Sequence, residues 1–278
     1  MKEFPIPVVA FGAGSQPEEE DLAYLPMPHE MDTYSMPGWN LEADPATLAA
    51  TCAVLDELRT KMSAQGEVTI ELRDLPAPVG ELLNQSLGHG EVSALVSAPN
   101  ALHIQETVFA GVWRVQQMSD QGAVLRDTLR ACTIPHEVCQ AALDAAVEVV
   151  APPPRPGMMN APAVLNELLE RSSQYASGQL AHVINFSLLP MSPEDLAYLY
   201  DAMQPGPVSI LSRGYGNCRI TSTGLAHVWW VQYFNSMDQL ILNTLEVTDV
   251  PEVALAAADD IRHSAERLDE WLTMMREQ

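Results

Sequence analysis

Basic residues are scarce in this sequence: 14 lysines and arginines stand against 37 aspartates and glutamates in 278 residues, for a formal net charge of −23. A protein of this charge repels phosphate groups, which argues against nucleic acid and anionic membranes as partners and favours a cationic one. Apolar runs of about 18 residues, the length that spans a membrane, are lacking too. We therefore expect no nucleic-acid binding and no membrane insertion.

Cysteine is also scarce, and the four cysteines lie far apart, without a Cys-x-x-Cys pair or a Cys/His run at zinc-ligand spacing. This spacing indicates neither a disulfide framework nor a structural metal site. Near the N-terminus "IPVVAFGAG" follows Lys2 as a signal core would, but Glu3 and the acidic "PEEED" interrupt that pattern. The sequence therefore predicts a cytoplasmic protein with reduced thiols and without a bound metal or cofactor.

What the sequence does contain is an internal repeat. Gly206 lies 116 positions after Gly90, and at this shift "GEVSALVS" aligns with "GPVSILSR". The same shift, without a gap, pairs Trp113 with Trp229, Val115 with Val231, Thr128 with Thr244 and Pro135 with Pro251. Such self-similarity predicts a tandem duplication.

The repeat sets the domain boundaries that we expect. Residues 1–43 are polar and interrupted by prolines, which predicts an extended or partly disordered arm. Residues 44–150 form the first unit and residues 160–278 the second. Between them, residues 151–159 include "APPPRPG" and form a stiff, extended linker.

Each unit is predicted to have the element order α-β-α-β-β-β-α. Asp44 and Asn160 indicate the starts of the opening helices, and Ser192 the start of the second helix of the second unit. Consecutive strands joined by short turns imply an antiparallel sheet covered by helices. The predicted fold class is α+β, with two repeated two-layer sandwiches. The short strands are expected at Val68–Leu72 and Ile184–Leu188, and the last helix at Pro251–Arg276.

Acidic residues are absent from the 36 residues between Ala202 and Met237, where even spreading would place about five. In the strand expected here, alternate side chains point to opposite faces. One set, Trp229, Val231 and Tyr233, matches Trp113 and Val115 of the first unit and is therefore assigned to the core. The other set is Trp230, Gln232 and Phe234, where the first unit has Arg114, Gln116 and Met118, a face that can stay wet.

The loop before this strand differs between the units as well. "SAPNALH" in the first unit corresponds to "RGYGNCR" in the second, whose glycines permit unusual backbone angles. We therefore predict that this loop and strand face bind a partner. The predicted partner-binding surface comprises Arg213, Gly214, Tyr215, Gly216, Asn217, Cys218, Arg219, Trp230, Gln232, Phe234 and Asn235. Two alternatives to this surface stay open for Trp230 and Phe234: burial in an internal contact between the units, or a small-molecule pocket.

Catalytic residues do not stand out. "GYGNC" lacks the spacing and the lysine of a phosphate-binding P-loop and leads into a strand. Cys218 and His227, nine positions apart, are more often packing residues than a thiol–imidazole pair. An iron or cluster site formed by Cys218 with Cys132 and Cys139 requires the two units to fold over one another. We therefore expect a protein that is not an enzyme.

Three stretches carry a resemblance to a known family: "SILSRGYGNCRITSTGLAHVWWVQYFNSM", "NFSLLPMSPEDLAYL" and "LPMPHEMDTY". They resemble the HupH/HyaF family of hydrogenase expression and formation proteins, and the resemblance extends over essentially the whole chain. It implies a non-catalytic, cytoplasmic accessory factor in the maturation of an uptake nickel-iron hydrogenase.

The same resemblance implies two partners. These are the iron-sulfur small-subunit precursor, bound before twin-arginine export, and a thioredoxin-like hydrogenase chaperone. The alternative function is that of a redox or iron-sulfur-cluster-handling maturation protein that uses Cys218.

Overall fold

The computed structural model describes residues 43–63, 68–97, 101–214 and 216–277. The expected N-terminal arm therefore lies outside the described residues, apart from Ala43. We call residues 43–150 the first half and residues 151–277 the second half.

The first half contains α1 (Pro45–Ser63), β1 (Val68–Glu71), α2 (Ala77–Leu87), β2 (Val92–Val96), β3 (Leu102–Glu106), β4 (Val112–Met118), β5 (Val124–Ala131) and α3 (His136–Asp144). The second half contains α4 (Ala161–Gln174), β6 (His182–Asn185), α5 (Pro193–Met203), β7 (Pro205–Ser212), β8 (Asn217–Thr223), β9 (Val228–Phe234), β10 (Leu240–Val247), the short 3-10 helix η1 (Glu252–Ala254) and α6 (Ala258–Arg276).

All ten strands form one antiparallel sheet, in the order β1-β5-β4-β3-β2-β7-β8-β9-β10-β6. The halves meet where β2 pairs with β7, with Ala94 opposite Ile210, Val92 opposite Ser212 and Val96 opposite Val208. Ala94 and Ile210 are themselves 116 positions apart, so the pairing is symmetric about them. The α+β class is confirmed. The expectation of a separate sheet in each unit is wrong, because the two edges pair with each other.

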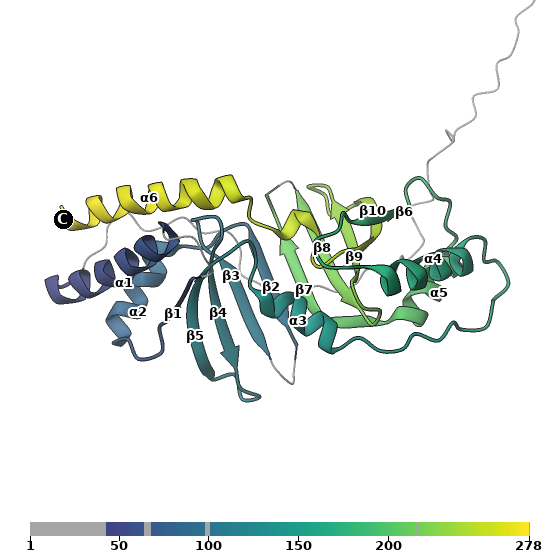
Figure 1. Cartoon of the computed structure of the whole chain (residues 1–278), viewed down its shortest axis with the longest axis horizontal. Helices are drawn as coiled ribbons and strands as arrows, with labels where there is room; N and C mark the ends of the chain where they lie inside the picture. Colours follow the sequence, from purple (N-terminus) through teal and green to yellow (C-terminus); the bar gives the residue numbers. More distant parts are fainter. Residues whose placement is uncertain (1–42, 64–67, 98–100, 215, 278) are drawn as a thin grey trace, which may run out of the picture.

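Helices cover both faces of the sheet, so the expected two-layer arrangement is also wrong. On one face, α3 and η1 pack over the middle of the sheet, where Trp113 and Trp229 are fully buried. On the other face, α1, α2 and α6 cover the first half, while α4 and α5 cover the second. Figure 1 shows these two groups of helices at opposite ends of an elongated molecule.

The predicted element order lacks one strand in each half. Four strands follow α2, and four follow α5, where three were expected in each case; β5 and β10 are the additional strands. The charged residues Arg126, Asp127 and Arg130 interrupt the apolar pattern of β5, and burial does not alternate along it: its first three residues are exposed and its last five are buried. The strand expected at Ile184–Leu188 lies at His182–Asn185.

The last helix is also interrupted. A helix continuous from Pro251 was expected, but η1 ends at Ala254 and α6 begins only at Ala258. Between them, the N–H of Ala256 donates to the carbonyl of Thr133 in the first half, at 2.9 Å. This bond fixes an extended segment that redirects the chain toward the first half.

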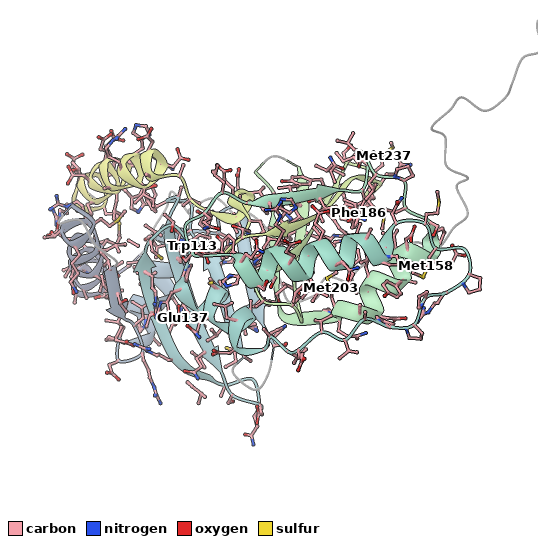
Figure 2. The ribbon with its side chains drawn as sticks, turned by 45° about the vertical axis from the view of Figure 1, so that its right-hand side comes forward. Trp113, Glu137, Met158, Phe186, Met203 and Met237 are labelled. Carbon is pink, nitrogen blue, oxygen red and sulfur yellow. The ribbon has the colours of Figure 1, made fainter. Side chains whose placement is uncertain are left out.

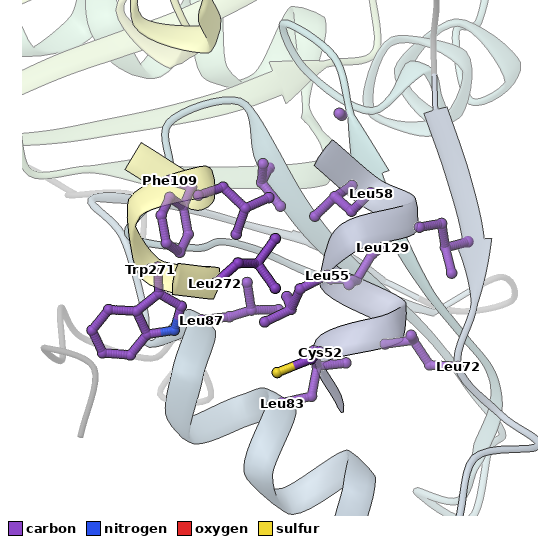
Figure 3. Packing of buried hydrophobic residues seen from close by; sticks show 14 of the residues in the cluster. Cys52, Leu55, Leu58, Leu72, Leu83, Leu87, Phe109, Leu129, Trp271 and Leu272 are labelled. Atoms are coloured by element: carbon purple, nitrogen blue, oxygen red, sulfur yellow. The ribbon is translucent and has the colours of Figure 1, made fainter. Parts of the chain in front are cut away.

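Helix α6 completes the hydrophobic core of the first half. Leu268, Trp271 and Leu272 pack with Leu55 and other residues of α1, as Figure 3 shows. The C-terminal helix therefore covers the half of the molecule that comes first in the sequence.

Two helix starts follow the expected capping pattern, and one does not. Asp44 Oδ1 accepts from the N–H groups of Ala46 and Thr47, and Ser192 caps α5. Asn160 makes no side-chain cap. Instead, buried Asp195 of α5 accepts from backbone N–H groups at the start of α4, among them that of Ala161 at 2.9 Å.

Candidate partner-binding site

The glycine-containing loop between β7 and β8 lies where the two halves meet. The N–H of Arg213 donates to the carbonyl of Glu91 in the first half, at 3.1 Å. A Cβ atom on Gly214 would collide with the Glu91 carboxylate, and Gly216 has a φ of 107°, a region that favours glycine. Both glycines and Arg213 are exposed. Tyr215 lies outside the described residues.

The strand end beneath the loop is held by side-chain contacts. The guanidinium of Arg219 lies over the Phe234 ring, 4.2 Å from its centroid, and Asn217 is paired with Phe234 across β8 and β9. Arg219 also lies 3.6 Å from the carboxylate of Asp238. In the adjacent turn, Asn235 Oδ1 accepts from two backbone N–H groups. The structure thus brings the loop, Arg219 and Asn235 together at one end of the β8–β9 hairpin.

The aromatic part of the predicted surface is buried. Trp230 is 7% exposed and Phe234 2%, so neither presents an open ring. Trp230 packs under α4 and α5 of its own half, where its Nε1–H donates to Asn243 Oδ1 at 2.6 Å. Its ring meets Phe186 edge-on, with centroids 6.2 Å apart. Burial inside the chain, one of the open alternatives, is therefore observed for Trp230, but within one half and not between the halves.

Gln232 is buried beside these rings. It is 5% exposed, and its Oε1 has no hydrogen-bond partner within the part of the chain that the structure describes. A buried polar atom without a hydrogen bond carries a desolvation cost.

Cys218 has an environment unlike that of a reactive thiol. It is 1% exposed in the central core, and burial raises its pKa to about 12 despite a hydrogen bond with Tyr233. Reactive cysteines are partly exposed and have lowered pKa values. His227 lies at the other end of the β8–β9 hairpin, against the Tyr175 ring and Asp249. The residues that the structure describes contain no group of three or more side chains placed to hold a metal ion.

The first half contains an open cavity that sequence reasoning did not identify. It has a volume of about 290 Å³ and lies between the end of α2 and the sheet face of β2, β3 and β4. Arg114 is held there by Asp127, with an Nε–Oδ1 distance of 2.9 Å, and Gln116 donates to the same carboxylate. The polar face of the first unit was the available signal for this cavity. Its polar lining comprises Asn84, His89, Ser93, His103, Gln105, Thr107, Arg114 and Gln116.

The corresponding place in the second half is filled. Trp230 stands 116 positions after Arg114, and Met203 stands 116 after Leu87. Only about 10 Å³ remains between α5 and the sheet at this point. The same position of the fold is thus a polar cavity in one half and a packed core in the other.

Within the described residues, we find no helix with the length and apolar character needed to cross a membrane.

Comparison with known proteins relates the whole chain to hydrogenase expression proteins. The family model described as the C-terminal conserved region of HupH hydrogenase expression protein matches residues 48–149 and 158–275. The hydrogenase expression/formation protein HoxQ of Cupriavidus necator is 42% identical, with 98% of each chain covered. HupH of Rhodobacter capsulatus is also 42% identical, over 99% of this chain and 100% of that protein.

Two further matches have lower sequence identity. The hydrogenase-1 operon protein HyaF of Escherichia coli is 32% identical, with 94% of this chain and 95% of that protein covered. A solved structure, the hydrogenase expression protein HupH from Thiobacillus denitrificans, is 27% identical, with a TM-score of 0.38, and matches 40% of this chain and 92% of that chain. On the extent of the sequence matches, the chain belongs to the HupH/HyaF family of hydrogenase expression/formation proteins.

Proposed function

We propose that this protein is a non-catalytic, cytoplasmic accessory factor in the maturation of an uptake nickel-iron hydrogenase. In this proposal it binds the iron-sulfur small-subunit precursor before twin-arginine export, with a thioredoxin-like hydrogenase chaperone as a second partner. The observation that carries the proposal is the 42% identity, over nearly the full length, to proteins named for hydrogenase expression and formation.

The exposed loop at the junction of the halves is the proposed contact site. Arg213, Gly214 and Gly216 are open, Asn217 and Arg219 are half-buried, and Tyr215 belongs to the same loop. Cys218, Trp230, Gln232 and Phe234 are buried, so they are not part of the open surface of this site. A net charge of −23 favours a precursor with basic segments, because opposite charges steer the encounter.

Capture of the precursor tests the proposal. Tagged protein is expected to retain the small-subunit precursor, and Arg213→Ala to weaken that capture by about tenfold, the effect of losing one important contact. Arg262→Ala is the control with the same change of charge, because Arg262 is exposed on α6 and pairs with Asp259 of its own helix. Absence of capture by the unmodified protein would refute the proposed function.

The redox alternative finds no support in the surroundings of Cys218. A thiol that is 1% exposed, with a pKa of about 12, is neither accessible nor ionised near neutral pH. We therefore expect no alkylation of Cys218 by iodoacetamide in the native protein at pH 8.

We also infer that the two halves are copies of one unit. Trp113 Nε1–H donates to the carbonyl of Cys132, and Trp229 Nε1–H donates to that of Thr248, with donors and acceptors both 116 positions apart. Positive φ angles recur at the same shift, for example at Gly88 and Gln204. These equivalences support the duplication.

A further inference from the structure

The β6 end of the sheet has an uncovered edge. Strand β6 has four residues and pairs with β10 only over Thr244–Val247, and the carbonyl of Asn243 accepts from Phe186 N–H just beyond. Among the described residues, no strand pairs with Leu240–Leu242 on the side away from β9. Unpaired strand edges are templates for pairing with another chain.

This edge is apolar and uncharged. No charged residue occurs from Gln239 to Leu245, and Ile241 is 61% exposed. Figure 2 labels Met237 and Phe186 at this end of the molecule. Other large exposed hydrophobic residues in β6 and its flanking loops, and in the β9–β10 turn, are Leu180, Val183, Leu188 and Met237.

The opposite end of the sheet has the same geometry with a different chemistry. Strand β1 pairs only with Thr128–Ala131 of β5, so no strand of the described part of the chain pairs with Val124 and Leu125 on that side. There, however, Arg126 forms an ion pair with Glu71 across the two strands. Charges on an edge strand are a means by which proteins prevent edge-to-edge pairing.

The second half has lost this protection. Leu242 stands 116 positions after Arg126, and Asn185 takes the place of Glu71, since Thr244 pairs with Asn185 as Thr128 pairs with Glu71. Both members of the ion pair are thus replaced by uncharged residues. The edge at β10 therefore lacks the charges that guard its counterpart at β5. The strand pairing is irregular at both edges, between Leu240 and Leu242 in β10 and between Val124 and Arg126 in β5.

Charge indicates what the open edge accepts. Residues 158–254 carry nine acidic and three basic side chains, so the part of the chain that contains the uncharged edge is negative overall. A segment with basic residues beside apolar ones suits such a surface: its basic residues are attracted by the negative charge, and its apolar residues contact the uncharged edge. Addition of an extended peptide to a sheet edge supplies main-chain hydrogen bonds.

We propose that Leu240–Leu242 of β10 accepts, as an added strand, an extended apolar segment with basic neighbours from the hydrogenase small-subunit precursor. This inference rests on the proposed function and adds to the loop at the junction of the halves a second contact with the same precursor.

Two matched variants test it. Ile241→Lys is expected to weaken binding of the purified precursor by at least about tenfold, because it puts a charge on the open edge and repels the basic segment. Leu125→Lys, at the corresponding position of β5, is expected to leave binding unchanged. Both sites are exposed, so circular dichroism and the melting temperature should match those of the unmodified protein.

The outcomes separate this inference from the function on which it rests. If the unmodified protein and Ile241→Lys bind the precursor equally well, the proposal that the β10 edge binds it is wrong, while the proposed function stands. If the unmodified protein does not bind, the function fails and this inference fails with it.

Amide hydrogen exchange adds a readout that does not depend on a variant. Protection at Leu240–Asn243 in the complex is expected, and protection confined to other regions would contradict edge pairing. If Ile241→Lys instead converts a dimer of the unmodified protein to a monomer, as measured by sedimentation, the occupant is a second copy of this chain and the proposal is wrong.

Discussion

The two halves of this molecule solve the same packing problem with different chemistry. Under α2, Arg114 is held by Asp127 and a cavity of about 290 Å³ stays open. At the matching place under α5, Trp230 donates to Asn243 and about 10 Å³ remains. Trp230 and Asn243 each lie 116 positions after Arg114 and Asp127, so a charged pair in the first half corresponds to a neutral pair in the second.

This difference extends across the sheet. The ion pairs Arg126–Glu71 and Arg130–Glu137 of the first half also have no counterpart, because Leu242 and Glu246 occupy the places of the two arginines. The first half thus keeps charges on its strands, while the second half has exchanged most of them for packing. A shared backbone does not imply a shared surface.

Truncation of the packed indole should produce the largest effect. Trp230→Ala removes a buried ring and is expected to lower the free energy of unfolding by about 3–5 kcal/mol. Arg114 borders a cavity that can admit water, so Arg114→Ala is expected to lower the free energy of unfolding by only about 1–2 kcal/mol. Urea unfolding measures both. Equal losses would mean that the two positions are not energetically different.

Glu106 of the first half provides a pH-dependent contrast, because Ser222 occupies its place in the second half. Burial raises the pKa of Glu106 from 4.5 to about 7, against the effect of hydrogen bonds from Gly111 and Val92. The unfolded chain loses this proton at lower pH than the folded one, so stability falls as pH rises from about 4.5 through 7. At about 1.4 kcal/mol per pKa unit, the loss is about 3 kcal/mol.

The measurement is stability against pH for Glu106→Gln and the unmodified protein. The variant cannot ionise there, and its curve is expected to lack the decline between pH 4.5 and 7. Parallel curves for the two proteins would show that Glu106 titrates normally.

Asp195 of the second half is shifted the other way. Burial alone would raise its pKa, but backbone N–H groups of Ser192, Ala161, Met159 and Asn160 lower it overall. Its stabilisation is therefore present above the usual aspartate pKa and is lost as pH falls through the lowered value. Asp195→Asn is expected to cost about 2 kcal/mol at pH 7, measured by urea unfolding. The difference should shrink below pH 4, and a constant difference would contradict the ionic role.

Backbone strain gives the smallest expected difference. Gln204 ends α5 with φ 51° and ψ 152°, where Gly88 ends α2. Residues other than glycine rarely adopt these backbone angles. Gln204→Gly is therefore expected to raise the free energy of unfolding by about 1 kcal/mol, which is measured as a higher melting temperature. Gly88→Gln should lower stability by at least as much. A loss of stability in Gln204→Gly would show that the glutamine is not strained.

Part of this architecture could be predicted from the sequence, for identifiable reasons. The alternation in β9 assigned Trp229 and Val231 to the central core, and the structure confirms that assignment. The start of α5 followed from Ser192. Such predictions succeed because they depend on residues close to one another in the chain.

The rest depended on contacts between distant residues. The pairing of β2 with β7 could not be predicted, because both strands read as ordinary apolar runs and nothing local identifies which edges meet. The burial of Trp230 depended on whether α5 covered its face. The exposed loop was recognisable from its glycines, whereas the cavity beside Arg114 was visible only as a polar strand face.

The placement of α6 has a consequence for how the protein is made. The core beneath α1 needs Leu268, Trp271 and Leu272, which leave the ribosome after all ten strands of the sheet. The half that is synthesised first must therefore keep apolar surface open to water until α6 has been synthesised. A chain that lacks the nineteen residues of α6 is expected to have an unstable core in its first half and not in its second.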